Sequence, residues 1–196
     1  MKYIYLYIKN ELVEECLKYG MKLSEFSNKV LTTSDNSTKS GIVAFLSPYD
    51  SELYYDDSYT CLKIATANIN CYIFNETCIY DKKISDDFFV SIEDYHIGSF
   101  EEPYALITST ILPENLFLYN KILDTPILIE NSKEYYYKKS INDMLENDIF
   151  SNYEIYQLLL LLGNKKNSFN KIDINDRLKI YVDKISGKKY TKKSSI

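Results

Sequence analysis

The distribution of β-branched and aromatic runs along the chain constrains its fold more than any other feature of the sequence. Residues 1–130 contain short apolar runs separated by polar turns, beginning with the alternating segment KYIYLYIK at residues 2–9. Alternation and β-branched or aromatic residues are typical of strands. The further runs that we interpret as strands cover residues 41–46, 61–67, 71–75, 104–112, 116–120 and 126–130.

Helices and loops are expected between these strands. Asn10 can cap a helix that Gly20 ends, and a second short helix is predicted over residues 24–30. Nine polar residues at 32–40 predict a mobile loop. Asn68 and Asn70 separate the strand runs on either side of them, which predicts a hairpin-like arrangement of those two strands.

The pattern becomes helical after residue 131. Three segments there have the apolar spacing of helices: 132–146, 151–162 and 173–185. No segment shows the alternating strand–helix rhythm of a doubly wound fold. We therefore predict a single α+β domain, in which a mixed sheet over residues 1–130 has flanking helices and carries a C-terminal helical extension at 131–187. The polar, basic residues 188–196 predict a disordered tail.

The net charge of −5 is unevenly distributed along the chain. Residues 1–130 hold 10 lysines and 20 acidic residues, whereas residues 131–196 hold 13 basic and 8 acidic residues. An acidic body does not attract phosphate backbones, but the basic C-terminal part can, so nucleic acid is an alternative partner there. A solvated charged face is the commoner outcome of such a run, and nucleic acid is therefore not the favoured partner.

The chain shows no export or membrane signal. Its N-terminal apolar run is too short and interrupted for a signal peptide, and the longest apolar run elsewhere, LLLLL at residues 158–162, is too short to span a membrane. We expect a cytoplasmic protein with no membrane partner and with reduced cysteines. One histidine and no C-x-x-C pair predict no metal site.

Few sequence motifs indicate catalysis. There is no G-x-G-x-x-G, phosphate-binding G-K-[ST] loop or G-x-S-x-G. The stretch DYHIGSFEEPYAL contains the one histidine, His96, followed by Glu101 and Glu102. These three residues are the candidates for acid–base chemistry. The alternative is that His96 lies in an exposed turn and the two glutamates form the solvated entry to a strand.

The order of elements resembles that of the DarT-type ADP-ribosyltransferases over residues 3–118. The opening IYLYIKNELVEECLKYGMKLSE and the later GIVAFLSPYDSELY follow the family's strand, helix ending on Gly and Leu, and aromatic strand before a proline turn. FEEPYALITSTILPENL is similar to the segment that begins with the family's catalytic glutamate. The resemblance implies an ADP-ribosyltransferase-like fold, NAD as cofactor, and Glu101 or Glu102 as the catalytic carboxylate. It also implies Tyr7, Tyr49 and Tyr54 as candidate cofactor-binding residues.

This chain departs from the family at the positions that hold NAD. Ile8 stands where the family has the histidine that grips the ribose, Asn10 where it has threonine, and Tyr49 where it has arginine. A carboxylate needs a cofactor held against it to act on an oxocarbenium-like centre. We therefore expect no catalysis and no cofactor. An NAD-dependent transferase with an altered site using Glu101 or Glu102 is the alternative.

Two tyrosine clusters favour a protein partner. ELYYDDSY places Tyr54 and Tyr55 among carboxylates, and KEYYYKK places residues 135–137 among lysines. Three consecutive tyrosines on a helix cover most of its circumference, so at least one points away from the core. Tyrosine is enriched in protein interfaces, although compositional bias alone also accounts for many of the 20 tyrosines. The sequence favours a binding or regulatory protein.

Overall fold

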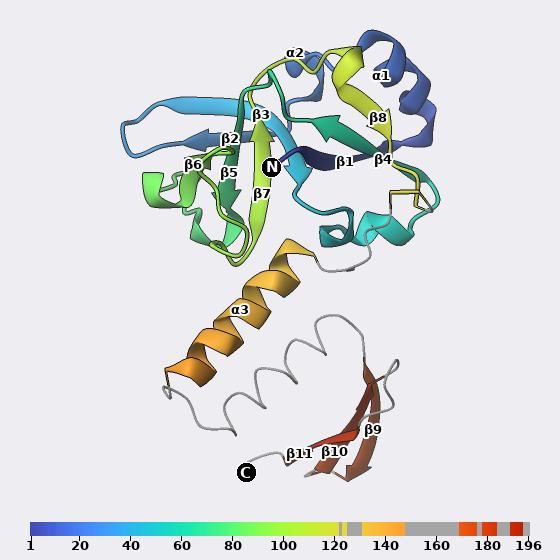
Figure 1. Ribbon diagram of the computed structural model, residues 1–196, viewed down its shortest axis with the longest axis vertical. Coiled ribbons are helices and arrows are strands. Elements are labelled where there is room, and N and C mark those ends of the chain that lie inside the picture. The colour runs from blue at the N-terminus through green and yellow to red at the C-terminus, as the bar shows by residue number, and fades with distance from the viewer. Residues whose placement is uncertain (122, 125–130, 148–168, 176–177, 184–188, 194–196) are drawn as a thin grey trace. The chain divides into compact units, whose positions relative to one another are not determined.

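The computed structural model describes residues 1–121, 123–124, 131–147, 169–175, 178–183 and 189–193 (Figure 1). The chain divides into two compact units, Met1–Lys139 and Ser140–Ile196. The α+β class is confirmed, with a large sheet and few helices in the described residues. The predicted strands at 126–130 and helix at 151–162 lie outside the described residues.

The first unit is built on one large antiparallel sheet. Its strands follow the order β6-β5-β7-β3-β1-β4-β8, and β2 pairs with the first half of β3. Their bounds are β1 Tyr3–Lys9, β2 Lys29–Thr32, β3 Thr38–Phe45, β4 Tyr59–Ala65, β5 Cys71–Asn75, β6 Phe89–Ser91, β7 Pro103–Ile107 and β8 Leu116–Leu118. The sheet is thus antiparallel at every named strand pair of the described residues, rather than mixed as the sequence predicted.

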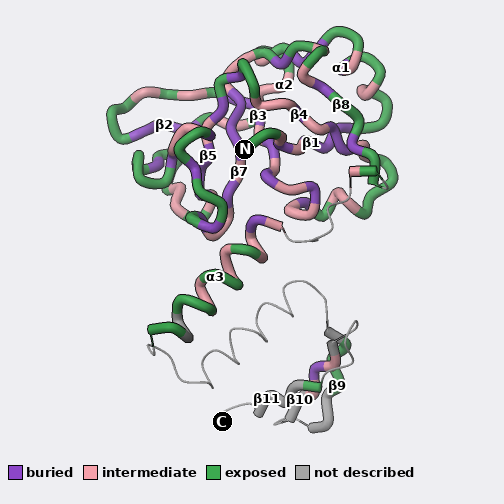
Figure 2. Tube along the Cα trace, viewed as in Figure 1, coloured by how far each residue is buried: buried purple, intermediate pink, exposed green. Residues whose placement is uncertain are grey.

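Strand alternation gives this sheet one aliphatic and one aromatic face. Along β1, Ile4, Leu6 and Ile8 belong to a buried aliphatic cluster, whereas Tyr5 and Tyr7 belong to an aromatic one. Because successive side chains of a strand point to opposite faces, the two clusters lie on the two sides of the sheet. Figure 2 shows the buried residues following the strands.

Helices α1 (Val13–Tyr19) and α2 (Leu23–Phe26) contribute to the aliphatic cluster. Gly20 ends α1 with φ 77°, a left-handed conformation that favours glycine, and its N–H donates to the Cys16 carbonyl at 2.8 Å. Met21 and Ile111 then exchange two backbone hydrogen bonds of 2.8 and 2.9 Å. These bonds place the segment after β7 beside the end of α1. The predicted end of the helix at Gly20 is confirmed.

Further predictions for the first unit are wrong. Residues 32–40 form the turn and flanking strands of the β2–β3 pair rather than a mobile loop. The segment 24–30 is helical only to Phe26, since β2 begins at Lys29. The strands β4 and β5 do not form a hairpin: β4 pairs with β1 and β8, and β5 pairs with β6 and β7.

Helix α3 covers Ser132–Glu146, as predicted, and the second unit contains a small antiparallel sheet. Its strands are β9 Phe169–Asn175, β10 Leu178–Asp183 and β11 Lys189–Lys193, in the order β11-β10-β9. The helix predicted over 173–185 is therefore wrong. Residues 189–193, assigned to a disordered tail, form a strand instead. In the described parts of both units, no helix has the length and apolar character needed to cross a membrane.

Candidate functional site

The candidate acid–base residues surround the start of β7 without forming a catalytic group. His96 is exposed, and its carbonyl accepts a hydrogen bond from the Ser99 N–H at 3.1 Å. Within the described residues, no hydrogen bond or ion pair joins the His96 imidazole to Glu101 or Glu102. The structure therefore gives this imidazole no carboxylate partner in the stretch where the sequence suggested one.

Both glutamates instead contact residues at the beginning of α3. The Tyr137 hydroxyl donates to Glu101 Oε1 at 3.4 Å, and Lys133 Nζ lies 3.7 Å from Glu102 Oε1. The Glu102 backbone is also fixed, because its N–H donates to the Asn75 side chain at 3.1 Å. Each half-buried carboxylate is thus engaged by the protein's own side chains.

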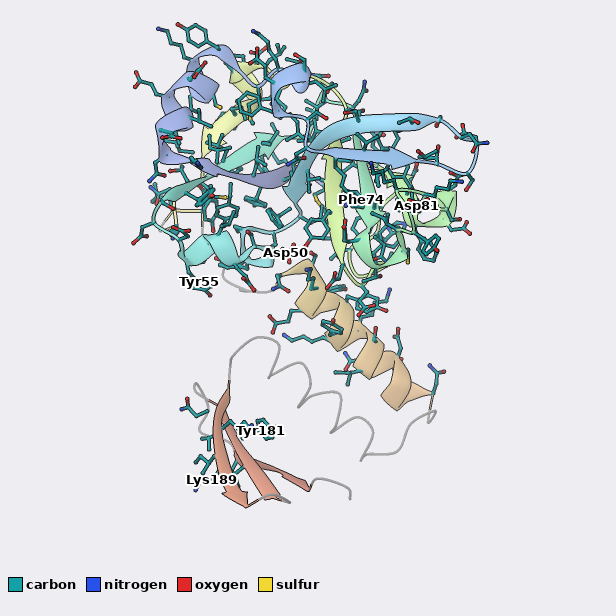
Figure 3. All side chains as sticks on the ribbon, turned by 180° about the vertical axis from the view of Figure 1, so that it is seen from behind. Asp50, Tyr55, Phe74, Asp81, Tyr181 and Lys189 are labelled. Atoms are coloured by element: carbon teal, nitrogen blue, oxygen red, sulfur yellow. The ribbon has the colours of Figure 1, made fainter. Side chains whose placement is uncertain are left out.

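The α3 anchor, which we define as Asp50, Ser132, Lys133 and Tyr104, holds the first turn of the helix. The Ser132 N–H and hydroxyl donate to the two carboxylate oxygens of Asp50 at 3.1 and 2.5 Å (Figure 3). Lys133 Nζ lies 3.3 Å from the Tyr104 hydroxyl and 5.2 Å from the centre of its ring. Because the N-terminal end of a helix carries partial positive charge, a carboxylate at Asp50 stabilises it.

Asn131, the residue before α3, completes its attachment. Its side-chain oxygen accepts a hydrogen bond from the Glu134 N–H at 2.5 Å, as in a helix N-cap. Its side-chain amide donates to the Tyr49 carbonyl at 3.3 Å. The turn that contains Tyr49 and Asp50 is therefore hydrogen-bonded to the start of α3.

Asp50 is a half-buried carboxylate. Burial raises the pKa of Asp50, and the hydrogen bond from Ser132 opposes that rise. The Ser47 N–H donates to the same carboxylate at 3.0 Å, so its two oxygens accept three hydrogen bonds. These three donors offset the loss of hydration that partial burial imposes on the carboxylate.

The three candidate cofactor residues do lie together, on the aromatic face. The Tyr7 hydroxyl donates to the Pro48 carbonyl at 2.7 Å, one residue before Tyr49. The rings of Tyr49 and Tyr54 are 4.9 Å apart, and the cluster that contains Tyr7 also includes Tyr54. Burial raises the pKa of the Tyr7 hydroxyl far above its usual range, so this group stays protonated.

Ile8 lies on the other face of the sheet. It is 7% exposed and belongs to the aliphatic cluster. Tyr7 and Tyr54, in contrast, belong to the aromatic cluster. The position that the resemblance aligns with a ribose-binding histidine is therefore separated by the sheet from the tyrosines that it aligns with the cofactor.

The aromatic face ends in a solvent-facing surface on the 3-10 helix η3, Glu52–Tyr55. We call it the Tyr55 surface, and it consists of Tyr54, Tyr55, Lys121 and the exposed carboxylates Glu52, Asp56 and Asp57. The Tyr55 ring is 83% exposed and lies edge-on to Tyr54 at 5.0 Å (Figure 3). Lys121 Nζ lies 4.6 Å from the centre of the Tyr54 ring and donates to its carbonyl at 2.7 Å, which fixes Tyr54 beneath Tyr55.

Sequence reasoning missed the α3 anchor, although a local signal was present. Asn131 and Glu134 have the spacing of a helix-capping pattern, and Ser47 and Asp50 form a capping box around a proline turn. Neither pattern shows that the two turns meet. In the described part of the chain, no group of three or more acidic, histidine or cysteine side chains is arranged to hold a metal ion.

Comparisons with protein-family models, curated proteins and solved structures gave no match to this chain.

Proposed function

We propose that this chain is a cytoplasmic binding protein on an ADP-ribosyltransferase-like scaffold, and that it engages another protein without catalysing a reaction. The observation that carries the proposal is the Tyr55 ring, which is 83% exposed and supported from below by Tyr54. A large exposed aromatic side chain offers contact area at small entropic cost. This is the usual character of an interface anchor.

The charges around Tyr55 define the partner's chemistry. Glu52, Asp56 and Asp57 are exposed carboxylates in the same short segment as Tyr55. Hydrogen bonds from Ser58 lower the pKa of Asp56, so this exposed carboxylate stays ionised at neutral pH. A partner surface rich in arginine or lysine would pair with these carboxylates, and its guanidinium groups would stack on the Tyr55 ring.

The engagement of both glutamates supports a role without catalysis. A general base must reach the proton that it removes. Here Tyr137 and Lys133 contact the two carboxylates, and the aligned ribose-binding position, Ile8, lies in the aliphatic core. Glu101 and Glu102 therefore fasten α3 in this proposal.

The test compares two equally exposed tyrosines. Tyr55→Ala removes the anchor, whereas Tyr80→Ala removes a ring that is 85% exposed at a different site. A partner captured with the wild-type protein would be purified and its affinity measured for both variants. We expect Tyr55→Ala to weaken binding at least about tenfold, as loss of an interface anchor does, and Tyr80→Ala to leave it unchanged. Equal affinities for the two variants would count against the Tyr55 surface.

An NAD-dependent transferase is the second candidate, because Tyr7, Tyr49 and Tyr54 gather on one face of the sheet. A thermal-shift titration with NAD separates the two functions. NAD at a hundred times its Kd would add roughly 2.7 kcal/mol of stability. We expect no shift. A shift, together with NAD hydrolysis that Glu101→Gln or Glu102→Gln abolishes, would establish the transferase instead.

A further inference from the structure

Strand β8 forms an exposed edge of the large sheet. It is the last strand of the order, and within the described residues it pairs with β4 alone. Its residues Phe117 and Leu118 are 44% and 52% exposed. The residues of β6, the strand at the other end of the order, are buried or half-buried. Of these two terminal strands, β8 is therefore the one that presents apolar side chains to solvent.

The hydrogen bonds of β8 leave one side of its backbone facing away from the sheet. The Tyr119 N–H donates to the opposed Cys61 carbonyl at 3.0 Å. Residues that bond to the neighbouring strand alternate with residues that do not, so Phe117 is the next one bonded to β4. The N–H and C=O groups of Leu118 and the C=O group of Leu116 therefore point away from β4.

Edge strands are usually protected against pairing with other chains. Lysine, proline and bulges are common devices for this protection. The three residues of β8, Leu-Phe-Leu, include no charge and no proline. The sheet treats β2 differently, because residues 82–84 hydrogen-bond to the Thr32 backbone at 2.8 and 3.0 Å. An exposed, apolar and unprotected strand edge is suited to the addition of another strand.

Apolar exposure continues beside β8. Helix α1 lies next to β8 and to the turn Pro113–Asn115 (Figure 1). Tyr19 at the end of α1 is 65% exposed, and Leu112, just before that turn, is 51% exposed. Exposed apolar residues that gather in one region mark an interaction surface. We call this surface the β8 edge, and it consists of Tyr19, Leu112, Phe117 and Leu118.

We propose that the β8 edge pairs with the β8 edge of a second copy of this chain, in an antiparallel register centred on Phe117. Two identical strands paired in this way are related by a twofold axis, so the assembly closes as a dimer. Leu118 of one copy then lies opposite Leu116 of the other, and its N–H donates to that residue's carbonyl. The two Phe117 side chains form a non-hydrogen-bonded pair, in which opposed side chains lie closest together.

The charges that flank β8 favour this antiparallel register. Glu114 precedes Phe117 and Lys121 follows it, and both charged residues are exposed. Antiparallel pairing places Glu114 of each copy beside Asn120 and Lys121 of the other, so two opposite-charge pairs form. Parallel pairing in register would place Glu114 beside Glu114 instead. Lys121 also donates to the Tyr54 carbonyl at 2.7 Å, and an ammonium group has three donors, so it can make both contacts.

The small size of the edge sets the strength of the dimer. Because β8 has three residues, the added strand pair forms few hydrogen bonds and belongs with small, transient interfaces rather than obligate ones. We therefore expect monomer and dimer in exchange, with a Kd on the order of micromolar or weaker.

The first test is sedimentation velocity of the full chain over a concentration series up to about 100 μM. We expect the sedimentation coefficient to rise with concentration. Leu118→Lys should weaken dimerisation at least about tenfold, because the twofold axis places the new charge in the interface twice. Ile97→Lys alters a side chain that is 53% exposed in the segment before β7, and should leave dimerisation unchanged. A chain that stays monomeric at every concentration, or equal weakening by the two variants, would overturn the proposal.

The second test measures the register by cross-linking. In the proposed dimer the two Phe117 Cα atoms lie about 4.5 Å apart, a distance that a disulfide spans. Phe117→Cys should therefore form a covalent dimer when diamide oxidises the two thiols, each of which gives up its hydrogen to the diamide. Ile97→Cys controls for random collisions, and the wild-type protein controls for the four native cysteines. Equal rates of cross-linking for Phe117→Cys and Ile97→Cys would overturn the proposal.

Discussion

A single half-buried carboxylate, Asp50, joins a proline turn to a helix that begins 82 residues later. Its contact with the Ser132 hydroxyl is 2.5 Å long, and Ser132 itself is 6% exposed. Because hydrogen bonds to charged groups contribute more than neutral ones, we expect Ser132→Ala to lower the free energy of unfolding by about 1.5–3 kcal/mol. Urea denaturation followed by circular dichroism measures this change.

The exposed Ser34 provides the control for this substitution. It lies in the turn between β2 and β3, where Ser34→Ala should change the free energy of unfolding by no more than about 0.5 kcal/mol. If the two alanine variants unfolded at the same urea concentration, Asp50 and Ser132 would not form a stabilising pair in solution.

The raised pKa of Asp50 predicts a specific pH dependence. The folded protein binds a proton at Asp50 more tightly than the unfolded chain does, because burial disfavours the carboxylate. The stability contributed by this group is therefore fully present below the usual aspartate pKa of about 4, and is lost as pH rises through the raised folded value. Asp50→Asn cannot titrate.

We expect the stability of the wild-type protein, relative to Asp50→Asn, to fall as pH rises above about 4 and to level off beyond the raised pKa. Taking the difference between two proteins cancels the opposite contributions of Asp56 and Asp124, whose pKa values are lowered. Parallel urea titrations from acidic to neutral pH give this curve. A difference that rises with pH would mean that Asp50 is stabilised as the anion.

Among the elements, α1 and α3 each depend on a glycine with positive φ. Gly20 ends α1 with φ 77°, and a Cβ there would meet the Ile111 backbone carbonyl. Gly98, with φ 88°, lies under α3, where a Cβ would come within 2.7 Å of the Tyr135 ring. Both alanine variants carry the strain of a left-handed backbone, about 1 kcal/mol or more. A ring can move and a paired backbone cannot, so Gly20→Ala should be the more destabilising.

Thermal unfolding of the two glycine variants tests this order. Adding Tyr135→Ala to Gly98→Ala removes the ring that the new methyl group would meet, and should recover part of the lost stability. For Gly20→Ala no such side-chain substitution exists, because the obstacle is the carbonyl of Ile111. A larger loss of stability for Gly98→Ala than for Gly20→Ala would mean that the Tyr135 ring yields less than the Ile111 carbonyl does.

Local sequence patterns correctly predicted those elements for which contacts with the rest of the chain favour the same structure. The strand at β1 and the helix α3 follow from alternation and from spacing, and the structure contains both. The segment 173–185 contains two patterns, because Leu178, Ile180 and Val182 alternate as in a strand, whereas Leu178, Tyr181, Val182 and Ile185 have the spacing of a helix. Pairing with β9 and β11 makes it a strand. Pairing between strands that are distant in sequence decides such cases. No single segment contains that information.

The same limit applies to the candidate site. Sequence singled out Glu101, Glu102 and His96 by residue type, and the structure shows that α3 residues contact the two glutamates but leaves His96 exposed. Asp50 was missed because its partner, Ser132, is remote in sequence. Only the family resemblance pointed to Tyr7, Tyr49 and Tyr54 as a group. The resemblance itself remains a prediction.

At the scale of the whole molecule, the chain combines an acidic unit and a basic unit with separate sheets. The second sheet has three strands, and β10 pairs with β9 on one side and β11 on the other. A two-stranded hairpin is only marginally stable in water, so β11 is needed for this sheet. The first unit has its own aliphatic core and should not depend on it.

Deletion of residues 188–196 therefore separates the two units. From composition alone this basic segment looks dispensable, but β11 makes five register pairs with β10. We expect the deletion to remove amide-exchange protection from β9 and β10 and to leave β1, β3 and β7 protected, because the latter belong to the first unit's sheet. Deletion of residues 194–196 alone spares β11 and is the matched control.

Hydrogen exchange with mass spectrometry resolves the two sheets in one experiment. If β9 and β10 kept their protection without β11, the second sheet would be stabilised by something other than its third strand. If β1 also lost protection, the two units would unfold as one.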